Sequence, residues 1–195
     1  MTFVWSWHNN NNNFKTNNIM NNNIRTNKTK EEFIKEMNLR IEIRKTIMDF
    51  VDNVYFPMMA TKFDGKVYNA RFLNTLNEEA KKISERMYVK KGYSNDEIEI
   101  QMRLTDWNYT DYESILLKCK TDGNGRIDYE ATINDKLCQT WIANFKSYMD
   151  EYQSAIDNYD EYMKVFVELA NALDNYNKLP HTFRGHLDKS WMRIY

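Results

Sequence analysis

The segment Asp122–Asp128 has the residue types of a calcium-binding loop. It resembles the middle of an EF-hand loop, with Gly125 at the sharp turn and Ile127 two residues later. In that register Lys120 replaces the first carboxylate and Ala131 replaces the bidentate glutamate, and no helix is predicted on either flank. Because both end ligands are lost and a cation is added, the segment is interpreted instead as the Gly/Asn-rich turn of a β-hairpin.

Two short acidic motifs have features of metal-dependent nucleases. Asp128 and Glu130 share one face of a predicted strand, and Asp64 and Lys66 have the spacing of half a nuclease motif. A metal site needs ligands that converge, and neither motif predicts convergence. We therefore interpret the first pair as a solvated strand face and the second as part of a turn.

Histidine and glycine patterns give no further sign of catalysis. The three histidines are His8, His181 and His186, all in the terminal segments. They form no zinc motif, and the chain has neither a phosphate-binding glycine loop nor a nucleophile elbow. We predict a non-enzymatic protein that needs no metal or other cofactor.

The C-terminal segment, residues 179–195, interleaves cations with aromatic residues. Arg184, Lys189, Trp191 and Arg193 have the residue types that hold phosphates and stack on bases, so one alternative function is single-stranded nucleic acid binding. The other interpretation is that this short tail packs back on an acidic helix. Lys and Arg number 27 against 28 Asp and Glu, a balance that argues against direct nucleic acid binding by the chain as a whole.

Two other segments are rich in aromatic residues that are candidates for contact with a partner. The first, residues 1–28, places Phe3, Trp5 and Trp7 ahead of an Asn-rich, low-complexity tract, and it is predicted either to dock on a partner or to cover a groove on its own domain.

The second is the segment 106–112, which contains Trp107, Tyr109 and Tyr112. Its acidic residues favour a protein partner over a phosphate backbone. The alternative is a hydrophobic plug between strands.

A seven-residue apolar repeat dominates residues 134–178, without Gly or Pro inside it. The pattern predicts one long helix that lies against something else. Because three positions in every seven are apolar, the stripe suits packing on the protein's own core better than a two-position coiled-coil seam. Either the protein's own sheet or an interface covers this stripe. The predicted partner-binding residues within it are Tyr152, Tyr159, Met163 and Phe166.

The remaining elements form an α+β body over residues 29–133. A capping box at Thr29–Glu32 begins one helix, and a second one at Thr75–Glu78 begins another. The order αββαβββα predicts an antiparallel sheet of about five strands covered by helices. The expected elements are helices at 29–53 and 75–92 and strands at 54–62, 66–72, 97–104, 114–120 and 126–133.

These features predict an intracellular protein that acts by protein–protein interaction. Two cysteines, Cys119 and Cys138, form no disulfide framework and are predicted to be buried thiols, which suits the cytoplasm or a virion. Abundant Asn, Lys, Ile and Tyr suggest an AT-rich genome, such as that of a phage. The preferred function is a virion or assembly component that self-associates into an oligomer through its long helix, as in a coiled coil, and through its aromatic arm. The alternative is an inhibitor of a host defence nuclease, similar in action to anti-CRISPR proteins. No membrane partner is expected.

Overall fold

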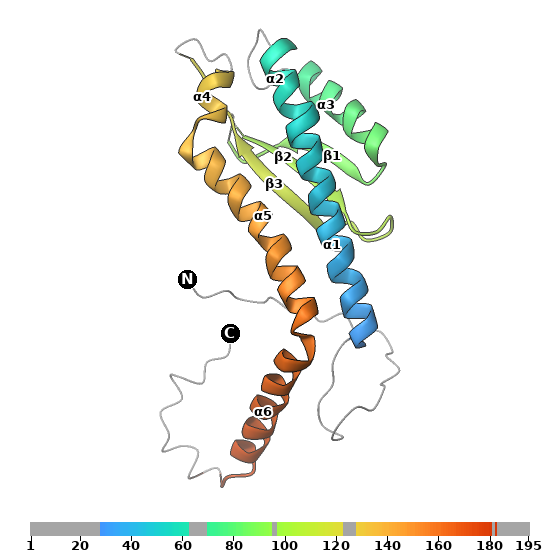
Figure 1. Ribbon diagram of the computed structural model, residues 1–195, viewed down its shortest axis with the longest axis vertical. Coiled ribbons are helices and arrows are strands. Elements are labelled where there is room, and N and C mark those ends of the chain that lie inside the picture. Colours follow the sequence, from blue (N-terminus) through green and yellow to red (C-terminus); the bar gives the residue numbers. More distant parts are fainter. Residues whose placement is uncertain (1–27, 63–69, 95–96, 123–127, 181, 183–195) are drawn as a thin grey trace. The chain divides into compact units, whose positions relative to one another are not determined.

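The computed structural model describes residues 28–62, 70–94, 97–122, 128–180 and 182 (Figure 1). The chain divides into two compact units, one made of Met1–Glu32 with Asn158–Tyr195 and the other of Phe33–Asp157. Apart from residue 28 of the predicted aromatic arm and residues 179, 180 and 182 of the predicted basic tail, these two segments lie outside the described residues. Their candidate residues are Phe3, Trp5, Trp7, Arg184, Lys189, Trp191 and Arg193.

The first helix begins at the predicted capping box. In α1, Lys30–Phe50, the N–H of Thr29 donates to Oε2 of Glu32 (2.9 Å) and the N–H of Glu32 donates to Oγ1 of Thr29 (3.2 Å). These two bonds satisfy amides that the first helical turn leaves without partners. The sequence therefore located this helix start correctly.

The predicted first hairpin is wrong, because helical structure continues where its first strand was expected. α1 runs into a π-helical segment η1, Val51–Tyr55, and then into α2, Phe56–Lys62. Pro57 is the second residue of α2, which directly follows η1, and the N–H of Phe56 donates to the carbonyl of Val51 five residues earlier. Val51, Tyr55 and Met59 are buried at four-residue spacing, so a helical face and not an alternating strand is covered.

The second predicted helix is displaced toward the N-terminus. α3 spans Ala70–Ile83, so the Thr75–Glu78 capping box lies inside the helix and does not begin it. The expected strand 66–72 falls partly outside the described residues, and its last residues belong to α3. The expected end of the helix is instead strand β1, Met87–Lys91, in which the buried residues alternate with partly exposed ones.

The sheet has three antiparallel strands in the described part of the chain, in the order β1-β2-β3, not the five that were expected. β2 spans Glu97–Arg103 and β3 spans Tyr112–Lys118, close to their predicted ranges. The last expected strand is instead a short helix, α4, Tyr129–Ile133. The Asp128 side chain accepts a hydrogen bond from the N–H of Ala131 (3.0 Å) and so caps this helix.

One face of the sheet forms the core with the helices. The register aligns Val89 with Ile100 and Ile100 with Ile115, and all three side chains are buried. They belong to one apolar cluster with residues of α1, α3 and α5, which lie next to the sheet in Figure 1. The prediction of a mixed α+β fold with helices covering an antiparallel sheet is confirmed.

α3 also protects the outer edge of β1. The side chain of Asn77 donates to the carbonyl of Val89 (2.6 Å) and accepts from its N–H (2.6 Å). This amide thus pairs with the edge strand as a neighbouring strand would, which occupies hydrogen-bonding groups that promote edge-to-edge association.

The C-terminal repeat is helical as predicted, but it forms two helices and not one. α5 spans Lys136–Asp157 and α6 spans Tyr159–Asn177. Asn158 lies between them with φ −106° and ψ 18°, outside helical geometry. Asn is a poor residue for a helix interior, because its amide competes for backbone hydrogen bonds. The apolar repeat keeps its phase across this site, which favoured a single helix, and that preference is wrong.

Candidate functional site

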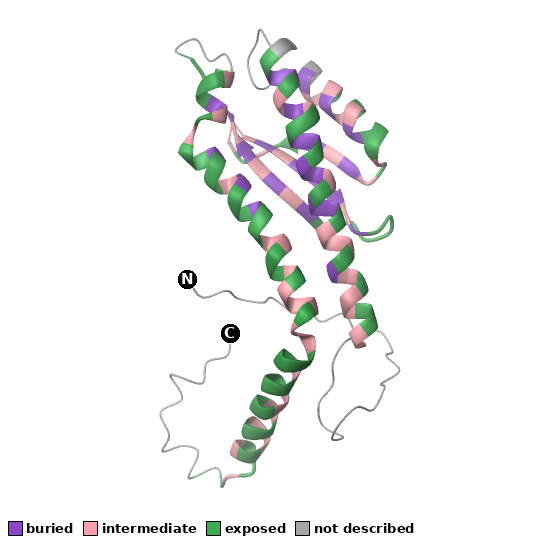
Figure 2. Ribbon diagram, viewed as in Figure 1, coloured by how far each residue is buried: buried purple, intermediate pink, exposed green. Residues whose placement is uncertain are grey.

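α6 carries an exposed apolar face. Tyr162, Val165, Phe166 and Leu169 lie at i, i+3, i+4 and i+7, and so share one side of the helix. Their exposed fractions are 52%, 60%, 45% and 48%, and no residue of α6 is buried. Figure 2 shows the difference from the helices of the other unit, where buried residues recur. We call these four residues the α6 face.

The predicted partner-binding residues of the stripe fall in different surroundings. Phe166 belongs to the α6 face, whereas Met163 is half-buried. Tyr159 is also half-buried, with the Lys30 ammonium 5.5 Å from its ring centre, and Lys30 forms an ion pair with Asp160 (2.6 Å).

The Trp107 loop, residues 104–111, is the second exposed aromatic feature. Trp107 is 92% exposed and Tyr109 is 72% exposed, so the interpretation as a plug between strands is wrong. Tyr112, the first residue of β3, is 39% exposed. The Arg103 guanidinium lies 4.6 Å from the ring centre of Tyr109, a cation–π contact.

Backbone and side-chain bonds shape this loop from within. The N–H of Leu104 donates to the carbonyl of Asp111 (3.0 Å), which closes its base. The Asn108 Oδ1 accepts from the N–H (3.0 Å) and the hydroxyl (2.8 Å) of Thr110. The loop therefore presents Trp107 to solvent on a defined backbone, as an aromatic anchor requires.

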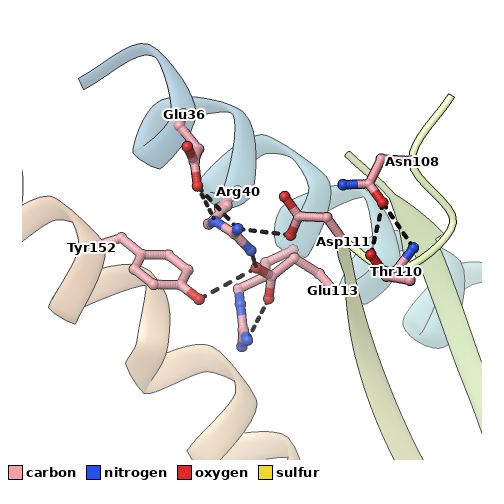
Figure 3. A network of polar contacts seen from close by, with 8 residues as sticks. Glu36, Arg40, Asn108, Thr110, Asp111, Glu113 and Tyr152 are labelled. Carbon is pink, nitrogen blue, oxygen red and sulfur yellow. Dashed lines mark hydrogen bonds and ion pairs between the residues drawn. The ribbon is translucent and has the colours of Figure 1, made fainter. Parts of the chain in front are cut away.

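A buried polar network joins α1, β3 and α5 (Figure 3). Glu113 lies on the core face of β3 and is only 3% exposed, although its side chain is acidic. Its Oε1 accepts from Arg40 (2.7 Å), and its Oε2 pairs with Arg44 (2.5 Å). The Tyr152 hydroxyl also donates to Oε1 (3.3 Å). We call these four residues the Glu113 network.

Aromatic rings complete the surroundings of Arg44. Its guanidinium lies 4.3 Å from the ring centre of Phe145, 4.7 Å from that of Tyr148 and 5.4 Å from that of Tyr152. It also donates to the carbonyl of Phe145 (2.7 Å). The charge therefore leaves water for stacked rings and a carboxylate, which is the environment that arginine tolerates best.

Two pKa shifts follow from this packing. Burial lowers the pKa of Arg40, but its hydrogen bond to Glu113 and the charges of Asp111 and Glu113 raise it more, and the net shift is upward. Burial raises the pKa of the Tyr152 phenol, and the charge of Glu113 raises it further. Both shifts favour the states in which these groups take part in the network, a charged Arg40 and a neutral Tyr152.

The sequence pattern did not reveal this network, and Tyr152 was expected at a partner interface instead. The available signal was an acidic residue, Glu113, at a strand position that shares one face with buried Ile115 and Leu117. A charge at such a position predicts a buried partner of opposite sign. Arg40 and Arg44, four residues apart on α1, are the complementary pair.

The candidate metal motifs do not form a site in the described residues. Asp128 caps α4, and Glu130 lies in that helix and not on a strand. Asp64, Lys66 and residues 123–127 lie outside the described residues. Where the structure describes the chain, no group of three His, Cys, Asp or Glu side chains could hold a metal ion.

The two cysteines are buried thiols that form no disulfide, as predicted. The Tyr55 hydroxyl lies 3.1 Å from the Cys119 sulfur. Burial raises the pKa of the Cys138 thiol, and the charge of Asp135 raises it further. A high thiol pKa keeps Cys138 protonated and poorly nucleophilic near neutral pH.

No helix in the described ranges combines the length and the apolar character needed to cross a membrane. Comparison with protein-family models, curated proteins and solved structures finds no match to this chain.

Proposed function

We propose that this protein is a non-enzymatic interaction protein that docks the α6 face on another protein. The main observation in support of this proposal is that four apolar residues of α6 are exposed together at helical spacing, namely Tyr162, Val165, Phe166 and Leu169. Clustered aromatic and aliphatic side chains of this kind gain free energy when a partner removes them from water. The preferred partner is a second copy of the chain, in the role of a virion or assembly component.

The apolar repeat supports this proposal. In α5 the repeat is covered by the protein's own sheet, with Cys138, Ile142 and Phe145 buried. The same spacing continues in α6 without burial. The sequence maintains the apolar stripe over both helices. This continuity is explained if a partner covers the stripe on α6.

The test is the absolute mass of the full-length chain, measured by light scattering after size exclusion over a range of concentrations. We expect a multimer that dissociates when Phe166→Glu places a charge in the α6 face. Asn171→Glu is the matched control, because it adds the same charge at an exposed polar position of α6. A mass of 23.6 kDa at every concentration would contradict self-association.

The Trp107 loop supports a second candidate, binding to a basic surface such as the nucleic-acid channel of a host defence nuclease. Trp107 is exposed beside Asp106, so the loop combines an apolar anchor with a carboxylate. This candidate predicts a monomer whose binding to a purified nuclease is lost with Trp107→Ala and kept with Phe166→Glu. Equal loss with both variants would contradict it.

A further inference from the structure

The α6 face has acidic neighbours on the same helix. α6 contains four acidic residues and only one cation, Lys164. Two of the acids, Glu161 and Glu168, are exposed, and the structure gives neither an ion pair among the described residues. A surface that combines apolar side chains with carboxylates is complementary to a segment that combines apolar side chains with cations.

An adjoining segment of the same chain has that composition. Residues 183–195 carry Arg184, Lys189 and Arg193 against one acid, Asp188. Their apolar residues include Phe183, Leu187, Trp191 and Ile194.

The distances along the chain are compatible with contact. At about 1.5 Å per helical residue, Glu168 lies roughly 14 Å from the end of α6 at Asn177. Lys189 follows Thr182 by seven residues, which can span at most about 25 Å. The cation can therefore reach the middle of α6.

A related contact already exists at the start of α6. Lys30, far away in the sequence, pairs with Asp160 at 2.6 Å and lies over the ring of Tyr159. α6 thus accepts a cation from a distant segment of its own chain, through one carboxylate and one aromatic ring.

We infer that residues 183–195 bind the α6 face of their own chain through their cations and apolar side chains. This inference rests on the proposed function and adds its regulation, since the tail occupies the face until a second copy displaces it. The tail then competes with assembly, and the balance depends on ionic strength because exposed charges are screened by salt.

The first experiment is zero-length carbodiimide cross-linking of the full-length protein, which joins lysine amines to adjacent carboxylates, followed by mass spectrometry. We expect a cross-link from Lys189 to Glu168 or Glu161. In an equal mixture of ¹⁴N- and ¹⁵N-labelled protein, this link forms within single chains. Its absence, or a link found only between chains, overturns the inference.

Charge reversal provides the second arm. The double variant Arg184→Glu/Arg193→Glu keeps Lys189, and we expect its intrachain cross-link yield to fall by about fivefold because two exposed ion pairs are lost. The control Lys45→Glu/Lys81→Glu makes the same charge change at exposed positions on α1 and α3. Equal yields in the two double variants overturn the inference.

Light scattering separates this inference from the proposed function. Association that is stronger in the Arg184→Glu/Arg193→Glu variant than in the parent supports both. Association without an intrachain cross-link rejects only the tail contact. A cross-link without association of either protein supports the tail contact and contradicts self-assembly.

Discussion

α5 and α6 continue the same seven-residue apolar repeat, yet α5 buries Cys138, Ile142 and Phe145, while α6 buries none of its residues. In α5 the repeat meets β3 and the Glu113 network. In α6 similar side chains remain at about half exposure. An apolar repeat therefore specifies a face that needs covering, but not what covers it.

The largest expected effect contrasts two phenylalanines at equivalent positions of the repeat. Phe145→Ala should lower the free energy of unfolding by about 3–5 kcal/mol, because it leaves a cavity at a buried site. Phe166→Ala should change it by less than about 1 kcal/mol in the monomer, since the site is exposed. Urea unfolding followed by circular dichroism measures both. Equal losses would show that α6 is part of the core.

The next effect concerns the charges that hold α5 against the sheet. Glu113→Gln should lower the free energy of unfolding by about 3 kcal/mol, because Arg40 and Arg44 lose their buried counter-charge. Glu42→Gln is the control, at an exposed position on α1. A similar small change in both variants would indicate that water reaches Glu113 and replaces the lost interaction.

Tyr152 gives a smaller, pH-dependent effect. Tyr152→Phe should lower the free energy of unfolding by about 1 kcal/mol at neutral pH, through loss of the hydrogen bond to Glu113. The folded-state pKa of Tyr152 is raised above its ordinary value of 10, so its contribution is present below pH 10 and is lost as the pH rises through the folded value. Chemical denaturation at several pH values should show the two proteins converging above pH 10. A constant difference would place the phenol in an unperturbed environment.

The smallest effect on stability is expected at the Trp107 loop. Trp107→Ala should change the free energy of unfolding by less than about 0.5 kcal/mol, because the side chain is 92% exposed. Thermal and urea unfolding test this. A loss of several kcal/mol would show that the ring packs on the protein's own surface, which would remove the loop as a docking site.

Local signals predicted several elements correctly. The start of α1 was located by reciprocal bonding between Thr29 and Glu32, which involves only residues three apart. β2 was predicted by its alternation of apolar and polar residues, and the register with Ile115 confirms it. Such patterns are reliable because backbone geometry alone fixes which side chains share a face.

The predicted elements were wrong where the same residues fit both the period of a strand and the period of a helix. Val54–Lys62 contains apolar residues and Pro57, which suit an edge strand, but the segment belongs to η1 and α2. Met87 fits both the apolar face of the preceding helix and the alternation of β1. Such short apolar runs are ambiguous until packing decides which face is covered.

By itself the sequence determined an α+β chain with a helical C-terminal repeat and two buried thiols, because these depend on composition and local period. Only the tertiary structure decided that Tyr152 joins the Glu113 network, that Asn158 separates α5 from α6, and that Phe145 is buried while Phe166 is exposed. Those outcomes depend on which residues far apart in the sequence come into contact, and a local sequence pattern does not specify those contacts.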